Sequence, residues 1–310
     1  MSLLASESAT RRTVVVVPCR NESATVGKVV ADFRRALPMA SVVVVDNAST
    51  DDTAVRARAA GATVVHEPRK GKGFALVTGL RAACGADHFV MVDGDDTYPA
   101  EAAIDLLAAA EAGADMVIGT RLADATPGAF RPGHSLGNRV FSLLVRVMFG
   151  MRTRDLFSGY RVLSRRFFDA LPLTATGFEI EAELSIRALV QGFAVVEVPV
   201  RYRARPAASE SKLRTVRDGY RVLAAIFTFF RDHRPLTFFG LLSLGLLLLS
   251  LAGGSVVVVE FLRTGLVPRL PLAVLSAALF ILSALAMTCG VLLSSINRRA
   301  TEIAALITRR

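Results

Sequence analysis

Two long stretches near the C-terminus contain no charged residue, and they restrict the possible fold more than any other feature of this chain. These are residues 236–259 and residues 270–296. At about 1.5 Å of helical rise per residue, each stretch is long enough to cross the roughly 30 Å hydrocarbon core of a bilayer. We therefore expect a hairpin of two transmembrane helices, at 236–262 and 270–296. Two buried core helices are the alternative, which the all-apolar run LLSLGLLLLSLAGGSVVVV disfavours because it has no polar face.

Basic residues flank the two stretches, and their distribution predicts an orientation in the membrane. The short connection carries only three charges, on Glu260, Arg263 and Arg269. Arg214, Arg217, Arg221, Arg231 and Arg234 precede the first stretch, and Arg298, Arg299, Arg309 and Arg310 follow the second. Because Arg and Lys are enriched on the cytoplasmic side, we expect a multi-pass protein of the inner (cytoplasmic) membrane with both termini in the cytoplasm.

The rest of the chain divides where its composition changes. Residues 1–12 lack the apolar core of a signal peptide, and we expect a disordered tail there. We expect a large cytosolic domain at 13–211, an amphipathic segment at 212–235 and a cytoplasmic tail at 297–310. The net charge of +10 favours anionic membrane lipid as a partner. No nucleic-acid motif and no Trp occur in the sequence, so we expect no nucleic-acid partner.

Short apolar runs alternate with helical segments in the N-terminal half. The runs cover 13–18, 41–46, 62–67 and 88–93, and helices are expected at 23–37, 51–60 and 73–83. Continuous runs rich in Val are typical of strands that are buried on both faces of a parallel sheet. The alternation predicts an α/β fold, a doubly wound and mostly parallel sheet with helices on both faces.

Polar side chains follow three of these strands, at the point where each strand ends. They are Asn21 and Glu22 after the first strand, Asp46 and Ser49 after the second, and Asp93, Asp95 and Asp96 after the fourth. Ligands of such sheets bind outside the carboxyl ends of the strands, so we expect these side chains to converge on one site. Ordinary capping and turn chemistry is the alternative for each group taken alone.

The acidic turn within FVMVDGDDTYP (89–99) is the candidate for a metal site. Carboxylates as close as Asp93 and Asp95 repel each other unless a cation lies among them, and oxygen ligands suit Mg²⁺ or Mn²⁺. A solvated acidic turn is the alternative. The chain has neither a GxGxxG motif after its first strand nor a P-loop, so we expect a metal ion to hold phosphates in place of a glycine-rich loop.

An ordered series of segments runs through residues 13–235. It consists of VVVPCRNE (15–22), VVVDNAST (43–50), GKGFA (71–75), MVDGDD (91–96), IGTR (118–121), DLFSGYR (155–161), GFEIEAEL (177–184) and VPVRYRARPAASESKL (198–213). The series resembles family 2 glycosyltransferases with a GT-A fold. Within them it is similar to the polyprenyl-phosphate glycosyltransferases of the dolichyl-phosphate-mannose-synthase-like group.

The resemblance implies overlapping sets of site residues. For nucleotide-sugar binding they are Pro18, Asn21, Glu22, Asp46, Ser49, Lys72, Asp93 and Gly94. For the acceptor phosphate they are Arg121, Arg139, Ser158, Arg161, Arg205 and Lys212. The metal ligands are Asp93 and Asp95, and the catalytic set is Asp93, Asp95, Asp155 and Arg161. This chain departs from the family at Asn47, where a second acidic residue is common, and at Thr97, where some members have a Gln ligand.

The resemblance also implies a reaction. A sugar moves from a nucleotide diphosphate, with a UDP-sugar favoured, to polyprenyl phosphate with inversion, giving a polyprenyl-phosphate-linked sugar for cell-envelope glycan or glycoconjugate assembly. The acceptor phosphate is already anionic, so no general base is required. Arginines suit this acceptor because they bind phosphate bidentately and stay charged. The alternatives are solvated surface arginines and, for Asp155, a cap or turn carboxylate.

Two amphipathic segments place the expected site at the bilayer surface. RVFSLLVRVMFGM (139–151) and KLRTVRDGYRVLAAIFTFFRDHRP (212–235) combine basic residues with apolar runs, which suits helices that lie in the interface plane. Packing against the domain core is the alternative for both. A homo-oligomer that forms through the transmembrane helices is a further expectation.

Three other functions remain open at this stage. A GDP-mannose-dependent polyprenyl-phosphate mannose synthase differs from the favoured reading only in its donor. A processive polysaccharide synthase would need a QxxRW segment, and the chain has no Trp. A non-catalytic membrane scaffold, or a subunit of a lipid-linked-sugar flippase, would not need the acidic turn.

Overall fold

The structure is a computed structural model. It describes residues 12–125, 134–150, 153–170, 174, 176–206 and 215–307. The chain forms two compact units, Met1–Ile226 and Phe227–Arg310, and each is described by itself.

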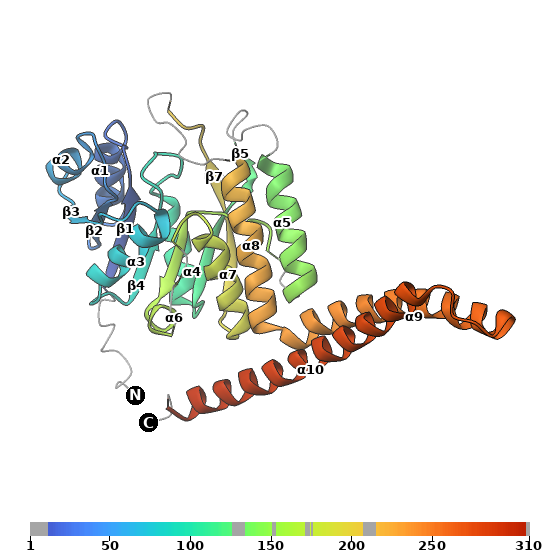
Figure 1. The fold of residues 1–310 in the computed structure, drawn as a ribbon. Coiled ribbons are helices and arrows are strands. Elements are labelled where there is room, and N and C mark those ends of the chain that lie inside the picture. The colour runs from blue at the N-terminus through green and yellow to red at the C-terminus, as the bar shows by residue number, and fades with distance from the viewer. Residues whose placement is uncertain are drawn as a thin grey trace. The chain divides into compact units, whose positions relative to one another are not determined.

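A sheet of seven described strands forms the centre of the first unit (Figure 1), in the order β3-β2-β1-β4-β6-β5-β7. The strands are β1 (Thr13–Cys19), β2 (Ser41–Asp46), β3 (Thr63–His66), β4 (His88–Met91), β5 (Met116–Ala125), β6 (Arg161–Ser164) and β7 (Val195–Tyr202). Neighbouring strands run parallel except at β6, which is antiparallel to β4 and β5. This mixed, mostly parallel sheet confirms the predicted α/β class.

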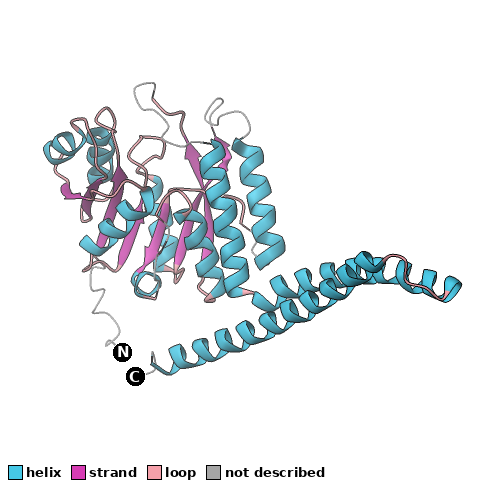
Figure 2. Cartoon of the chain, viewed as in Figure 1, coloured by secondary structure: helices cyan, strands magenta, loops and turns pink. Residues whose placement is uncertain are grey.

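Helices cover both faces of the sheet (Figure 2). They are α1 (Val26–Ala36), α2 (Thr53–Ala59), α3 (Lys72–Ala82), α4 (Ala102–Glu111), α5 (His134–Phe149), α6 (Arg165–Asp169), α7 (Ile180–Val190) and the first part of α8 (Thr215–His233). Side chains alternate along β1, so Val15 and Val17 pack in one hydrophobic cluster with α1, α2 and α4. Val16 packs in a second cluster with α3, α6 and α7. The Val-rich runs are therefore buried on both sides, as expected of central strands.

The main differences from the sequence prediction lie at the ends of elements. The fourth strand ends at Met91 rather than at residue 93, so Asp93 already lies in the turn. The first helix begins at Val26 rather than at residue 23, because Thr25 and Val26 donate their N–H groups to Glu22 O and form a turn before the helix. The early end of β4 matters for the site because it frees the backbone of Asp93 from the sheet.

The predicted amphipathic helix at 139–151 corresponds to α5, which covers residues 134–149. Val145 and Phe149 are buried, so one side of α5 packs within the first unit. Val140, Leu143 and Val147 lie on another side and are exposed. The helix therefore packs on the domain and still presents apolar side chains to its surroundings.

The second unit is dominated by two long helices, α9 (Pro235–Thr264) and α10 (Leu270–Ile307). Both are long and apolar enough to cross a membrane, over Pro235–Thr264 and Leu270–Ala300. Buried serines join them as an antiparallel hairpin: Ser283 Oγ donates to Ser243 O at 2.9 Å, and Ser250 Oγ donates to Ser276 O at 2.7 Å. The two apolar helices predicted for this region are confirmed, and α10 continues as helix beyond its expected end at residue 296.

Candidate active site

The acidic turn after β4 is the centre of the candidate site. Thr25 Oγ, in the turn before α1, donates to Gly94 O at 2.7 Å. Asp96 has a positive φ of 58° and pairs with Lys28 of α1 at 2.7 Å. The turn is therefore held from the side of α1, which leaves the carboxylates of Asp93 and Asp95 to other partners.

Gly94 lies in this turn at a place where an added side chain would collide with a neighbouring atom. A Cβ atom there would lie 2.3 Å from Cys19 Sγ and 3.5 Å from the next nearest atom, on Val17. We expect Gly94→Ala to destabilise the first unit by about 1–3 kcal/mol, the usual cost of overpacking. In a double-mutant cycle, Cys19→Ala should recover most of this loss because it removes the atom that the new methyl group meets first. Thermal melting of detergent-solubilised protein, followed by far-UV circular dichroism, measures both effects, and independent additive losses would contradict this account.

Asp93 belongs to a partly buried chain of charges. Lys72 Nζ, at the start of α3, lies 2.5 Å from Asp93 Oδ1 and 2.6 Å from Glu181 Oε1 of α7. Burial alone would raise the pKa of Asp93, but the charge of Lys72 outweighs it and lowers that pKa. The pKa of Lys72 is raised because the two carboxylates outweigh the effect of its burial. Lys72 therefore bridges two carboxylates and holds Asp93 at the edge of the sheet.

Asp95 is almost wholly buried and has a different cation as its partner. It pairs with Arg205, which follows β7, and it accepts a hydrogen bond from Thr97 Oγ at 2.6 Å. Burial raises the pKa of Asp95, the nearby charge of Asp93 raises it further, and the charge of Arg205 opposes both. The two carboxylates of the turn thus repel each other, and each is balanced by its own basic side chain.

The ends of β1 and β2 are joined by a network of short polar contacts. Asn21 donates its N–H to Ser49 Oγ at 3.0 Å and accepts from Thr50 N through its side-chain oxygen at 2.8 Å. Asp46 accepts from Ser49 N at 3.2 Å and contacts His66 Nδ1 at 3.1 Å. The predicted donor-site residues of these two strands therefore lie together.

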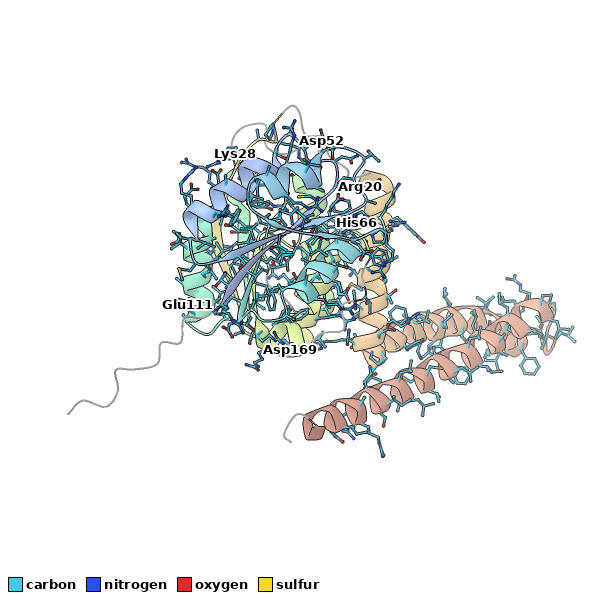
Figure 3. All side chains as sticks on the ribbon, turned by 90° about the vertical axis from the view of Figure 1, so that its left-hand side faces the viewer. Arg20, Lys28, Asp52, His66, Glu111 and Asp169 are labelled. Atoms are coloured by element: carbon cyan, nitrogen blue, oxygen red, sulfur yellow. The ribbon has the colours of Figure 1, made fainter. Side chains whose placement is uncertain are left out.

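The remaining residues of the predicted donor site lie close to this network. Glu22 is buried and donates its N–H to Thr53 Oγ at 2.8 Å, and Pro18 is half-buried in β1 opposite Val45. In Figure 3, the labelled Arg20 and Lys28 lie in the upper part of the first unit, and Glu111 and Asp169 lie in its lower part. The site is thus built at the edge where β1, β2 and β4 end.

Asn47 stands where the resemblance led us to expect a second acidic residue, and its contacts explain why an amide works there. Its NH₂ group donates to Glu67 O at 3.1 Å and to Arg69 O at 2.6 Å, while its oxygen accepts from Gly71 N at 2.8 Å. A carboxylate has no donor for the two carbonyl groups. Asn47 therefore shapes the connection between β3 and α3 that leads to Lys72.

Arg121 of the predicted acceptor set and Asp155 of the predicted catalytic set form one buried ion pair. Arg121 Nε and Nη2 lie 2.7 Å from the two carboxylate oxygens of Asp155, and Arg121 N donates to the same group at 3.1 Å. Although burial opposes it, the charge of Arg121 lowers the pKa of Asp155. Arg121 follows Thr120, where the register of β5 on β7 shifts, and such irregularities redirect side chains beside active sites.

Arg161 lies opposite Met91, the last residue of β4, and both Arg161 and Ser158 are buried. The Arg161 guanidinium is fully buried and donates to Ser158 O, to Leu156 O and to Ser185 Oγ at 2.7–2.9 Å. Burial lowers the pKa of Arg161 to about 10. Ser158 is buried as well and donates to Gly119 O. Both residues hold the 155–161 segment in place, and their direct contact with the acceptor stays a prediction.

The side chains of two other predicted acceptor residues lie outside the described part of the structure. Lys212 lies outside the described residues, and the side chain of Arg139 is outside them too, although its backbone belongs to α5. Of the predicted acceptor set, Arg121 and Arg205 are therefore the cations that the structure brings to the acidic turn and its surroundings.

Several residues that complete the site were not in the predicted set. Glu181 reaches Lys72 from α7, and Thr97 supports Asp95. Tyr98 accepts a hydrogen bond from Gly159 N at 3.1 Å, and Gly159 lies so close to Asp93 that a Cβ atom there would be 2.4 Å from Asp93 Oδ2. Sequence spacing signals Thr97 and Tyr98 only as neighbours of the acidic turn. Nothing local connects Gly159 or Glu181 to it.

The oxygen ligands of the acidic turn suit a hard divalent cation. In the part of the chain that the structure describes, no group of three or more His, Cys, Asp or Glu side chains surrounds a common point. The two carboxylates of Asp93 and Asp95 are what the protein offers here. Mg²⁺ commonly binds through one or two carboxylates, with substrate phosphates and water completing its shell, so the residues present fit such an ion.

Comparisons with known proteins find similar sequences. Residues 14–171 match the model of the family described as Glycosyl transferase family 2. The glycosyltransferase AglJ of Haloferax volcanii is 35% identical over 226 residues, which cover 73% of this chain and 74% of that protein. The polyprenol monophosphomannose synthase of Mycolicibacterium smegmatis is 30% identical over 217 residues, covering 63% of this chain and 79% of its own.

A solved structure extends the similarity to the fold. Glucosyl-3-phosphoglycerate synthase from Mycobacterium tuberculosis, in complex with Mn²⁺, UDP-glucose and phosphoglyceric acid, superposes with a TM-score of 0.58 at 25% identity. The match covers 72% of this chain and 80% of that one. The first unit therefore has the GT-A fold that the ordered segments predicted.

Proposed function

Because this chain belongs to glycosyl transferase family 2, we propose that it transfers a sugar from a nucleotide diphosphate sugar to polyprenyl phosphate with inversion at the anomeric carbon. The observation that carries the proposal is the meeting of the acidic turn with basic side chains from distant parts of the chain. Asp93 meets Lys72, and Asp95 meets Arg205. A site of this kind suits a reaction in which one phosphate group leaves and another attacks.

The donor is assigned to the edge where β1, β2 and β4 end. Pro18, Asn21, Glu22, Asp46 and Ser49 would hold the nucleoside, and Lys72 and Gly94 would lie toward the diphosphate. The bound UDP-glucose in the M. tuberculosis synthase supports a UDP-sugar here. The mannose synthase among the relatives keeps a GDP-mannose donor as the alternative.

Asp93 and Asp95 would hold a divalent cation, Mg²⁺ or Mn²⁺. When bound, such an ion neutralises the charge that builds up on a leaving diphosphate. The Mn²⁺ in the M. tuberculosis complex supports this dependence. Lys72 contributes a further fixed positive charge beside Asp93, held there by Glu181. Charges that are fixed before the reaction stabilise a developing anion without having to reorganise.

The acceptor phosphate is assigned to the side of Arg121 and Arg205. An oxygen of the phosphate attacks the anomeric carbon, a new C–O bond forms, and the bond to the diphosphate breaks. The acceptor is anionic before it attacks, so no side chain has to remove a proton. Asp155 and Arg161 act as positioning residues: Asp155 orients Arg121, and Arg161 fixes the 155–161 segment.

The two apolar helices suit an enzyme whose acceptor is a lipid. We assign the protein to the inner membrane, with the first unit and both termini in the cytoplasm, on the basis of the arginines that flank the spans. The exposed apolar residues of α5 suit contact with the bilayer interface. A homo-oligomer through the transmembrane helices stays a prediction.

A transfer assay on detergent-purified protein tests the proposal. Polyprenyl phosphate and Mg²⁺ or Mn²⁺ are combined with radiolabelled UDP-sugars and GDP-mannose, each with and without EDTA. We expect one donor to label the organic phase, and we expect EDTA to abolish that label. If no donor transfers label although the lipid and the metal are demonstrably present, the non-catalytic scaffold becomes the better reading.

A further inference from the structure

Arg205 is more exposed to solvent than Lys72 and Arg121, which also form ion pairs in the site. Its side chain is 30% exposed, although the carboxylate of Asp95 that it pairs with is only 4% exposed. The side chain of Arg121, in contrast, is 8% exposed and uses two nitrogen atoms on Asp155. Arg205 therefore combines contact with the acidic turn and a side chain that has room to move.

The backbone beside Arg205 is anchored to the same turn. Arg203 N donates to Thr97 O at 2.9 Å, and Thr97 Oγ donates to Asp95 Oδ1 at 2.6 Å. The anchor lies two residues before Arg205, which follows the end of β7 at Tyr202. A change in the partner of Arg205 thus requires rotation of one side chain and leaves its neighbouring backbone in place.

The charges in the described part of the site leave no surplus for an incoming phosphate. Around the acidic turn and the Arg121 pair, and apart from the pair of Asp96 with Lys28, the described carboxylates are Asp93, Asp95, Asp155 and Glu181, and the described cations paired or buried among them are Lys72, Arg121, Arg161 and Arg205. Among these described side chains, an acceptor phosphate buried here would add negative charge without a further cation to balance it, which is costly in a partly dry site. The balance changes when a divalent cation takes over Asp95, because the charge of Arg205 then loses its partner.

We propose that Arg205 exchanges partners during the reaction: it pairs with Asp95 until a divalent cation binds there and then turns to the acceptor phosphate. The proposal rests on the proposed function and adds a binding order to it. Metal and donor bind first, and the acceptor phosphate binds tightly only afterwards. Arg205 thereby couples the two halves of the site, and a lipid phosphate is not held at a site that has no donor.

The first test measures Mn²⁺ binding to the full chain in detergent, with no donor and no acceptor, by the electron paramagnetic resonance signal of free Mn²⁺. Arg205→Gln should bind Mn²⁺ about tenfold more tightly than the wild type, because the ion no longer competes with a partly exposed charged pair. Arg203→Gln is the matched control, since it removes the same charge two residues away. Its affinity should stay within about twofold of the wild type, because Asp95 pairs with Arg205 and not with Arg203.

Two results of this test would overturn the proposal. One is an Arg205→Gln variant that binds Mn²⁺ no more tightly than the wild type. The other is an equal gain in Arg203→Gln, which would reveal a general effect of net charge. A wild-type chain that binds neither Mn²⁺ nor UDP counts against the proposed function itself, whereas Mn²⁺ binding that ignores Arg205 removes only the exchange.

The second test measures binding of farnesyl phosphate, with farnesol as the control for the lipid tail. Wild-type protein should bind farnesyl phosphate more tightly when Mn²⁺ and UDP are present, and its binding of farnesol should not change. Arg205→Gln should lose this dependence on Mn²⁺. Equal metal dependence in both proteins would overturn the exchange, even if the wild type transfers sugar normally.

Discussion

Asp95→Ala is expected to lower the rate of sugar transfer by at least about a hundredfold, the size of effect seen when one preorganised charge-stabilising group is lost. Asp95 is almost wholly buried at the centre of the acidic turn, beside Asp93 and in contact with Arg205 and Thr97. The substitution removes one of the two carboxylates that suit the divalent cation. Its partner Arg205 is partly exposed and tolerates the loss, so the fold and membrane insertion should be retained.

Asp96→Asn is the matched control for this prediction. Asp96 is the next residue of the same turn, but it pairs with Lys28, whose side chain is 51% exposed. Such pairs contribute only about 0–1 kcal/mol. Asn also tolerates the positive φ of 58° at this position. Transfer by Asp96→Asn should stay within about threefold of the wild type, as expected for so weak a pair. Residual activity of Asp95→Ala at the level of Asp96→Asn would remove Asp95 from the metal site.

Asp155→Asn is expected to be the most destabilising of the substitutions considered, at about 3–5 kcal/mol, because it leaves the charge of Arg121 buried without its partner. Asp155 is fully buried and accepts three hydrogen bonds from Arg121. Thermal melting at neutral pH measures the loss. Asp169→Asn is the matched control: its pair with Arg165 is exposed on both sides and should change stability by less than about 1 kcal/mol.

The dependence on pH gives this prediction a definite sign. Arg121 lowers the pKa of Asp155 below its ordinary value of 3.8. The stabilisation is therefore fully present above pH 3.8 and is lost as the pH falls through the lower pKa of the folded protein. The difference in stability between wild type and Asp155→Asn should shrink in acid. A difference that is constant from neutral pH into strong acid would mean that Asp155 acts through its shape rather than its charge.

A double substitution separates the structural role of this pair from its role in the reaction. Arg121→Met with Asp155→Leu replaces the ion pair by apolar side chains of similar size, and such replacements are often neutral for stability. We expect stability to recover and transfer to remain low, since the acceptor phosphate would lose the Arg121 charge. Recovery of both would leave Arg121 with a purely structural role.

The donor half of the site could be predicted from the sequence because it depends on local patterns. Parallel strands end at the same edge of a sheet, so the residues after β1, β2 and β4 had to meet. Asn21, Asp46 and Asp93 indeed lie on that edge, although β4 ends two residues earlier than its apolar run suggests. What the pattern could not show is the partner of each carboxylate. Glu181 reaches Lys72 from a helix more than a hundred residues further along the chain.

The acceptor half was harder to predict, because the role of an arginine depends on its burial. Arg161 and Arg205 look alike in sequence, and both lie in segments shared with the family. The structure buries Arg161 among carbonyl groups and leaves Arg205 partly open beside Asp95. This difference follows from long-range packing of the 155–161 segment against α7, which has no signature in the local sequence. The role of Asn47 could not be predicted either, because Asn47 acts through three hydrogen bonds to a loop about twenty residues further along the chain.

Acceptor choice is the most direct test of the central claim that the site transfers sugar to a lipid phosphate. With the donor identified, wild-type protein is given equal amounts of polyprenyl phosphate, the matching polyprenol without phosphate, and 3-phosphoglycerate, and the labelled products are separated. We predict that the label enters polyprenyl phosphate alone and that Asp95→Ala forms none of it. Label on 3-phosphoglycerate or on the free polyprenol, with polyprenyl phosphate unlabelled, would contradict the proposed acceptor and the roles assigned to Arg121 and Arg205.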